Sequence, residues 1–271
     1  MVLNNLVDPI IIAMYRHAAR LQLLAQTNRP GISEIFREES THVAVSAVAE
    51  SYFVNVGEKQ IEIPVPADAV MAKGLNAQFD FILDAANSPN ARRLIYFVDP
   101  ELGSVLQRGG SPGAPKLLYI VSCTPALERT DLRSSDFAEF RDSIAQKMLD
   151  LTNMLGPAIS TYSAKMNEYW QQKTGKDPQL DVSKPEPLGI FNKDAWSITM
   201  GLLTKAQFQD PKTNSMTQKV TCEISSAICA RNRLLSLSCR SIFQGPETIG
   251  SALNLVLAWR DKVLEMNPNT P

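Results

Sequence analysis

The sequence predicts an α+β protein in which grouped, mainly antiparallel strands pack with about five helices. In several segments apolar residues recur at steps of three and four, as on one helix face, and in others they alternate with polar residues. The alternating segments come in local groups and do not take turns singly with helices, which favours this class over a doubly wound parallel sheet. The chain has 271 residues, 44% of them hydrophobic, which suffices for a substantial core.

The first predicted elements are a helix and a β-hairpin. Asp8–Pro9 has the pattern of an N-cap residue followed by proline at the first helical position. Residues 41–65 change to an alternating pattern that Gly57–Glu58 interrupts, which predicts a hairpin. Pro64 and Pro66 mark the end of an edge strand, because proline cannot donate a hydrogen bond to a neighbouring strand.

The middle of the chain predicts two helices around a pair of strands. Apolar spacing indicates a helix over residues 67–86, and strong β-formers indicate strands at Leu94–Val98 and Leu117–Cys123. A loop rich in glycine and proline, residues 109–115, lies before the second strand. The firmest helix runs from Asp136 to Leu155, because its apolar stripe is continuous and its first turn carries a variant of the capping box.

The last part of the chain predicts a further helix, a linker and a meander. A helix is expected over residues 157–170, and the composition of residues 176–189 indicates a linker. This divides the chain into an α+β main domain, 1–175, and a part that spans 190–271, which could equally belong to the same domain. Gly245–Pro246 opens a final helix. The alternating segments before it, typical of an antiparallel meander, are Trp196–Leu202, Val220–Ile224 and Leu235–Cys239.

Composition excludes several classes of function. The formal net charge is −1, whereas a dedicated duplex-DNA-binding protein normally has a strong basic excess. Four cysteines without a C-x-x-C pair and only two histidines argue against a zinc site, so no metal is expected. The loop at 109–115 lacks the spacing of a phosphate-binding or dinucleotide-binding loop, so no cofactor is expected.

Compartment and membrane contact follow from the same residues. Each cysteine lies in an apolar or alternating run, which predicts buried, reduced thiols typical of a reducing compartment. No stretch approaches the ~20 apolar residues that span a bilayer. The N-terminal apolar run has no basic region before it, unlike a secretory signal. We therefore expect no membrane span, and a location in the cytoplasm or within an assembly formed there.

Three groups of residues are candidates for catalysis. Glu39 and His42 form a single E-x-x-H pair, whereas di-iron bundles use two such pairs. Cys123 ends a predicted strand, where a nucleophile served by His17 or His42 is conceivable. His17 could also act as a general base, because its pKa lies near neutrality, but the sequence identifies no nucleophile or orienting acid for it. A solvated acidic face explains the Glu39–His42 pair and a buried strand cysteine explains Cys123, so no catalytic residue is assigned. An enzyme whose site comes from scattered residues stays open as an alternative, because triads are recognised by geometry.

Two groups of residues are candidates for binding partners. Arg231, Arg233 and Arg240 fall on the last strand group with few acids nearby, which suggests a sheet face that tracks a single-stranded nucleic acid. No aromatic residue lies between them to strengthen that interpretation. The second group is rich in methionine and aromatic rings, which favour association. Its members are Tyr162, Met166, Tyr169 and Trp170.

The sequence therefore favours a non-enzymatic structural or assembly protein that acts through protein–protein surfaces. Self-association or membership of a larger assembly is expected, and a viral or phage structural subunit is one concrete version. The edge hairpin and the loop at 109–115 are elements that can extend a sheet or hold a neighbour. A single-stranded nucleic-acid-binding protein and an enzyme are the alternatives.

Overall fold

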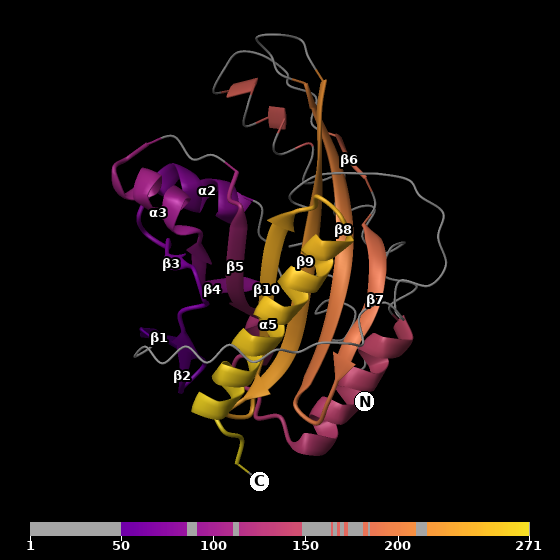
Figure 1. Ribbon diagram of the computed structural model, residues 1–271. Helices are drawn as coiled ribbons and strands as arrows, with labels where there is room; N and C mark the ends of the chain where they lie inside the picture. The colour runs from indigo at the N-terminus through magenta and orange to yellow at the C-terminus, as the bar shows by residue number, and fades with distance from the viewer. Residues whose placement is uncertain are drawn as a thin grey trace.

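The computed structural model describes most of the chain after residue 49: residues 50–85, 91–110, 114–147, 181–183, 185–209 and 216–270, with residues 164, 167, 168, 171 and 172. These residues form an eight-stranded sheet, a separate two-stranded sheet and helices on both faces of the larger sheet (Figure 1). All paired strands are antiparallel, which confirms the α+β class.

The eight-stranded sheet takes strands from both sides of the predicted linker. Its order is β3-β4-β5-β10-β9-β8-β6, and β7 also pairs with β8. The strands are β3 (Val70–Met71), β4 (Arg92–Val98), β5 (Leu117–Cys123), β6 (Asp181–Val182), β7 (Glu186–Lys193), β8 (Ser197–Gln209), β9 (Met216–Ala230) and β10 (Arg233–Ile242). β6 and part of β7 lie within the stretch predicted as a linker. Pro187 and Gly189 are tolerated there because β7 is irregular, with register shifts beside both.

The predicted hairpin is found as the separate two-stranded sheet, formed by β1 (Ser51–Val56) and β2 (Lys59–Pro64). The first part of the predicted range, residues 41–49, lies outside the described residues, as does the helix predicted from Asp8–Pro9. Its turn contains Gly57 with φ of 61°, a backbone conformation that glycine adopts without strain. Val54 pairs with Ile61, and both side chains point into the core. Alternation along β1 thus buries one face of the hairpin and leaves the other to solvent.

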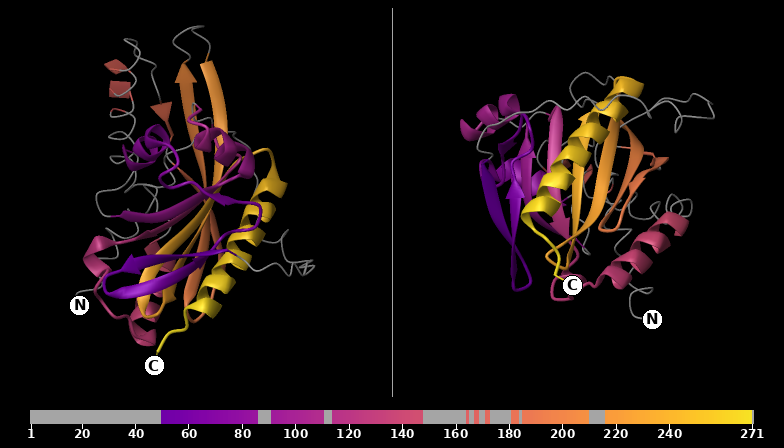
Figure 2. Two further views of the ribbon diagram at one scale, coloured as in Figure 1. Left: turned by 90° about the vertical axis from the view of Figure 1, so that its left-hand side faces the viewer. Right: turned by 60° about the horizontal axis from the view of Figure 1, so that its bottom comes forward.

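The C-terminal helix α5 (Pro246–Met266) covers one face of the large sheet, and the hairpin lies beside it (Figures 1 and 2). Its buried side chains follow steps of three and four and pack against β9, β10 and β2. The Trp259 ring contacts Tyr119 and Phe97 edge-on, with centroid distances of 5.5 and 6.1 Å. The helix predicted from Gly245–Pro246 is confirmed.

The opposite face is covered over β4 and β5 by two short helices, α2 (Ala77–Ala85) and α3 (Pro100–Gln107). The helix predicted over 67–86 is therefore shorter, because Val70 and Met71 pair with β4 instead. α3 was not predicted. Its N-cap, Asp99, accepts a hydrogen bond from the Leu102 amide at 3.0 Å, and Pro100 follows at the first helical position.

A further helix occupies residues 134–147 and begins two residues before the predicted start at Asp136. Its predicted apolar stripe is confirmed at Phe137, Phe140 and Ile144, which are buried. Asp136 accepts the Arg133 amide at 3.0 Å, which satisfies one donor before the first turn. Residues 148–155 of this predicted helix lie outside the described part of the chain, as do most residues of the helix predicted over 157–170.

Candidate interaction surface

The hairpin presents two edges, and the β2 edge is closed by side chains from the end of α5. The Asn267 carboxamide donates to the Glu62 carbonyl at 2.7 Å and accepts from the Glu62 amide at 2.9 Å. Trp259 Nε1 donates to the Pro64 carbonyl at 2.8 Å. Asn267 thus reproduces the paired hydrogen bonds of a neighbouring strand, and with Trp259 it closes the β2 edge at Glu62 and Pro64.

The β1 edge is open at its centre. Glu50 and Val65 are joined by a backbone hydrogen bond, so the alternating geometry of an antiparallel pair turns the amides and carbonyls of Ser51, Phe53 and Asn55 away from β2. Among the described residues, the Asn55 carbonyl is bound by Arg92 Nη2 at 2.9 Å, whereas Phe53 has no backbone partner. The Phe53 side chain is 57% exposed.

The outer strand β7 differs from β1 in regularity. Its pairing with β8 shifts register twice, between Pro187 and Gly189 and between Ile190 and Asn192. Bulges and proline prevent an edge strand from accepting another chain, because the row of donors and acceptors is no longer evenly spaced. β1 has no register shift and contains no proline. Of these two described edges, β1 is the one suited to pairing.

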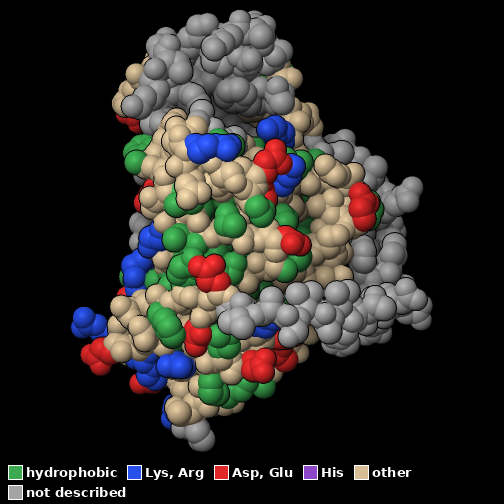
Figure 3. Space-filling model, turned by 60° about the vertical axis from the view of Figure 1, so that its left-hand side comes forward, with side chains coloured by type: hydrophobic (Ala, Val, Ile, Leu, Met, Phe, Trp, Pro, Cys, Tyr) green, Lys and Arg blue, Asp and Glu red, His purple; other side chains and the backbone are tan. Residues whose placement is uncertain are grey.

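Hydrophobic side chains on this side of the molecule are dispersed. Figure 3 shows them scattered among charged groups over the face that carries the hairpin, α2 and α3. The large exposed hydrophobic residues of these elements and β3 are Phe53, Val70 and Phe81. The described side chains of this face do not gather into one large apolar patch, and Phe53 is the exposed hydrophobic residue that lies on the β1 edge.

A buried polar strip crosses the face of the large sheet that α2 and α3 partly cover, opposite α5, and it consists of Glu223 and Ser225 on β9 and Ser238 and Arg240 on β10. Glu223 and Arg240 are register partners and each is 2% exposed. Arg240 Nε donates to Glu223 Oε2 at 2.7 Å, and Ser225 Oγ donates to Glu223 Oε1 at 3.1 Å. Burial raises the pKa of the Glu223 carboxyl, while Arg240 and the serine hydroxyls oppose that rise.

A second buried arginine, Arg93, lies at the β4 side of this face. Its guanidinium donates to Asp84 at 2.9 Å and to the Leu83 carbonyl. Burial lowers the pKa of Arg93 to about 10, the Asp84 carboxylate opposes that change, and the positive charge of Arg240 adds to it. The polar strip and its β4 side thus hold two buried arginines, of which Arg240 is paired with Glu223 and Arg93 with Asp84.

The structure does not bring the three predicted nucleic-acid-binding arginines onto one exposed face. Arg231 is exposed in the β9–β10 turn. Arg233 is 4% exposed and donates to Asp131 at 2.6 Å, and Arg240 is held by Glu223. Arg233 and Arg240 are seven positions apart on one strand, so they point to opposite faces of the sheet.

Of the other predicted candidates, Cys123 lies within the described residues. Cys123 is buried, which raises the pKa of its thiol to about 12 and disfavours the nucleophilic thiolate. All four cysteines are buried and free of disulfide bonds, as predicted for their burial. The remaining candidates lie outside the described residues: His17, Glu39, His42, Tyr162, Met166, Tyr169 and Trp170.

The described residues show neither a metal-binding cluster nor a membrane-spanning helix. There, histidine, cysteine, aspartate and glutamate side chains do not gather in groups of three or more that could hold a metal ion. Within the same residues, no helix is both long and apolar enough to cross a membrane.

Comparison with known proteins gives little to add. The sequence matches no protein-family model, and no curated protein matches it. The chain is similar to the solution structure of cyanobacterial PsbP (CyanoP) from Synechocystis sp. PCC 6803, with 14% sequence identity over 80% of this chain and 95% of that chain. The TM-score is 0.32, which is too low to indicate a shared fold.

Sequence reasoning missed the residues that distinguish these surfaces. Asn267 follows the last turn of α5 and precedes Pro268, a common arrangement at a helix end, which gave no hint that its side chain closes β2. Glu223 lies in an alternating segment interpreted as having one wet face. The only sequence feature that pointed to Glu223 was its position between two apolar residues, Cys222 and Ile224.

Proposed function

We propose that the protein is a non-enzymatic assembly protein that self-associates by pairing the β1 strands of two copies. The observation that carries the proposal is the contrast between hairpin edges: Asn267 and Trp259 close β2, whereas the backbone of Phe53 on β1 faces outward without a partner among the described residues. An open, regular edge strand is a template for another strand.

The pairing has a defined geometry. An antiparallel pair centred on Phe53 places this residue opposite its own copy, where the two can exchange both backbone hydrogen bonds. Ser51 then faces Asn55 of the second copy. The arrangement has two-fold symmetry, so each copy uses the same surface and the contact closes after two subunits. The exposed Phe53 rings lie close enough across such a pair to bury each other partly.

Light scattering after size-exclusion chromatography tests the proposal across the micromolar range. The wild-type chain should form a dimer, and Phe53→Lys should shift it toward monomer, because lysine on an edge strand opposes pairing. Met216→Lys is the matched control, since Met216 is 59% exposed and lies on β9 at a distance in sequence and sheet from the hairpin.

Two results would contradict the proposal. One is a wild-type monomer throughout the concentration range. The other is equal weakening by Phe53→Lys and Met216→Lys, which would indicate a general effect of added charge on association. Circular dichroism of each variant confirms that the β-sheet content is unchanged.

A further inference from the structure

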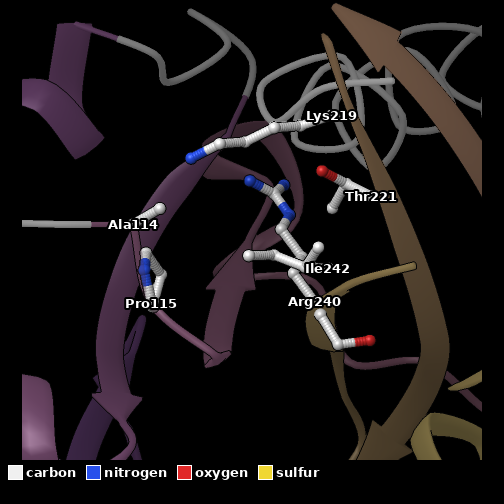
Figure 4. Close-up of a pocket in the computed structure, with 7 residues that line it drawn as sticks. Ala114, Pro115, Lys219, Thr221, Arg240 and Ile242 are labelled. Carbon is white, nitrogen blue, oxygen red and sulfur yellow. The ribbon is translucent and has the colours of Figure 1, made fainter. Parts of the chain in front are cut away.

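A small pocket opens between β9, β10 and the segment that leads into β5 (Figure 4). It has a volume of about 20 Å³, which is enough for roughly one water molecule or one oxygen of a larger group. The described residues that line it are Ala114, Pro115, Lys219, Thr221, Arg240, Ser241 and Ile242.

Arg240 supplies a buried donor without an acceptor. Its Nε is bound to Glu223, on the side of the guanidinium that faces the polar strip. Its Nη2 is fully buried and has no hydrogen-bond partner within the described chain. Figure 4 shows the guanidinium directed into the pocket, beside the Lys219 side chain. A buried donor left unpaired is costly, so an acceptor supplied by a ligand would stabilise this arrangement.

Lys219 supplies the second positive charge at the same pocket. It lies on the same face of β9 as Thr221 and Glu223, two and four positions along the strand. Lys219 forms no ion pair with the described residues. The described lining contains two cations and no acid. Glu223 balances Arg240, so within the described part of the chain no carboxylate is paired with Lys219.

The geometry points to a binding site for a phosphate group, held by Arg240 Nη2 and Lys219 Nζ. Arginine and lysine donors that converge on one space match the several oxygens of a phosphate. The Thr221 hydroxyl lines the same space and adds a polar group at its wall (Figure 4). The pocket encloses space for only one phosphate oxygen, so the rest of the phosphate would lie outside it. The phosphate could therefore be free or be the terminal group of a nucleotide.

Calorimetric titration with inorganic phosphate at constant ionic strength tests the site on the full chain. Lys219→Gln should weaken phosphate binding by about tenfold, since it removes one charge-assisted hydrogen bond. Lys205→Gln is the matched control: Lys205 lies on the neighbouring strand and pairs with Val220, so its side chain points to the other face of the sheet. Its phosphate affinity should equal that of the wild type.

A second variant, Arg240→Lys, keeps a positive charge for Glu223 and removes Nη2; it should also weaken binding. If Arg240→Lys does not fold, Lys219→Gln and its control decide alone. A parallel titration with adenosine 5′-monophosphate separates the sources, because tighter binding than inorganic phosphate identifies a nucleotide and equal binding identifies free phosphate. The proposal is overturned if the wild type shows no phosphate binding, or if Lys205→Gln and Lys219→Gln weaken it equally.

Discussion

The buried Glu223–Arg240 pair allows a quantitative test of the structure. Both side chains are 2% exposed, and one hydrogen bond of 2.7 Å joins Arg240 Nε to Glu223 Oε2. Replacing Glu223 by leucine would leave the Arg240 charge buried with neither Nε nor Nη2 bonded to an acceptor. Breaking a buried pair in this way costs about 3–5 kcal/mol of the free energy of unfolding.

The double variant Glu223→Leu with Arg240→Met removes both charges and keeps apolar side chains of similar length. Such a replacement should be neutral or stabilising by about 1–4 kcal/mol, because neither partner then requires desolvation. The two single variants and the double variant form a double-mutant cycle with the wild type. Urea unfolding followed by tryptophan fluorescence measures each free energy, with Trp259 in the core as a reporter.

The expected coupling energy between the two positions is therefore several kcal/mol. If Glu223→Leu cost less than about 1 kcal/mol, the pair would behave as a solvated surface pair does. That result, with a coupling energy near zero, would refute the conclusion that the polar strip is buried. A change in the urea dependence of one variant would instead indicate an altered unfolded or native state, and the cycle would need a conservative replacement such as Glu223→Gln.

Three further predictions concern the hairpin and the cysteine beside it. Gly57→Ala should lower the free energy of unfolding by more than about 1 kcal/mol, because φ is 61° and a Cβ would lie 2.3 Å from the Glu128 carbonyl oxygen. Gly74→Ala, also at positive φ but with nothing within 4 Å, should cost less in urea unfolding, and equal costs would refute the steric argument. The hydrogen bond from Arg92 lowers the pKa of Glu128 in the folded chain below its ordinary value. The contribution of the Arg92–Glu128 pair to the free energy of unfolding is therefore fully present above the ordinary pKa and is lost as the pH falls through the folded pKa. Glu128→Gln should thus lower the free energy of unfolding at pH 7, measured by urea titration, by about 0.5–1 kcal/mol, and the difference from wild type should shrink in acid; a constant difference would contradict this. Cys123 should react slowly with iodoacetamide at pH 8 and rapidly after unfolding, because a pKa of about 12 leaves about one thiolate in ten thousand; rapid labelling of the folded chain would show that the thiol is accessible.

Local signals predicted those elements whose boundaries are set by neighbours in the sequence. The turn at Gly57 and the proline at the start of α5 act within a few residues, and both elements are found where expected. The helix predicted over 67–86 is shorter because a partner distant in sequence intervenes: the β4 strand pairs with Val70 and Met71. Asn76 then caps α2 by accepting the Phe79 amide at 3.0 Å.

α3 shows a signal that was present and not used. Asp99–Pro100 repeats the N-cap and proline pattern that predicted a helix at Asp8–Pro9. Apolar spacing does not predict this helix, because a helix of eight residues has few apolar positions and lies between two strong strand signals. The Asp99 side chain also accepts the Lys116 amide at 2.8 Å, which ties the start of α3 to the start of β5. Sequence spacing cannot show such a contact.

The positions of the arginines along β10 show what the alternation of side chains in a strand can predict about the candidate site. Arg233 and Arg240 are separated by seven residues, an odd number, so a regular strand must direct them to opposite faces. The sequence therefore already excluded a single basic face that contained both. What it could not show is that polar residues at alternate positions are buried, since exposed and covered polar faces give the same alternation.

Glu223 and Arg240 are register partners on adjacent strands, a relation that depends on how the β9–β10 turn sets the register. The left-handed backbone of Arg231 and Asn232 makes that turn two residues long, and this geometry places the carboxylate opposite the guanidinium in the centre of the sheet.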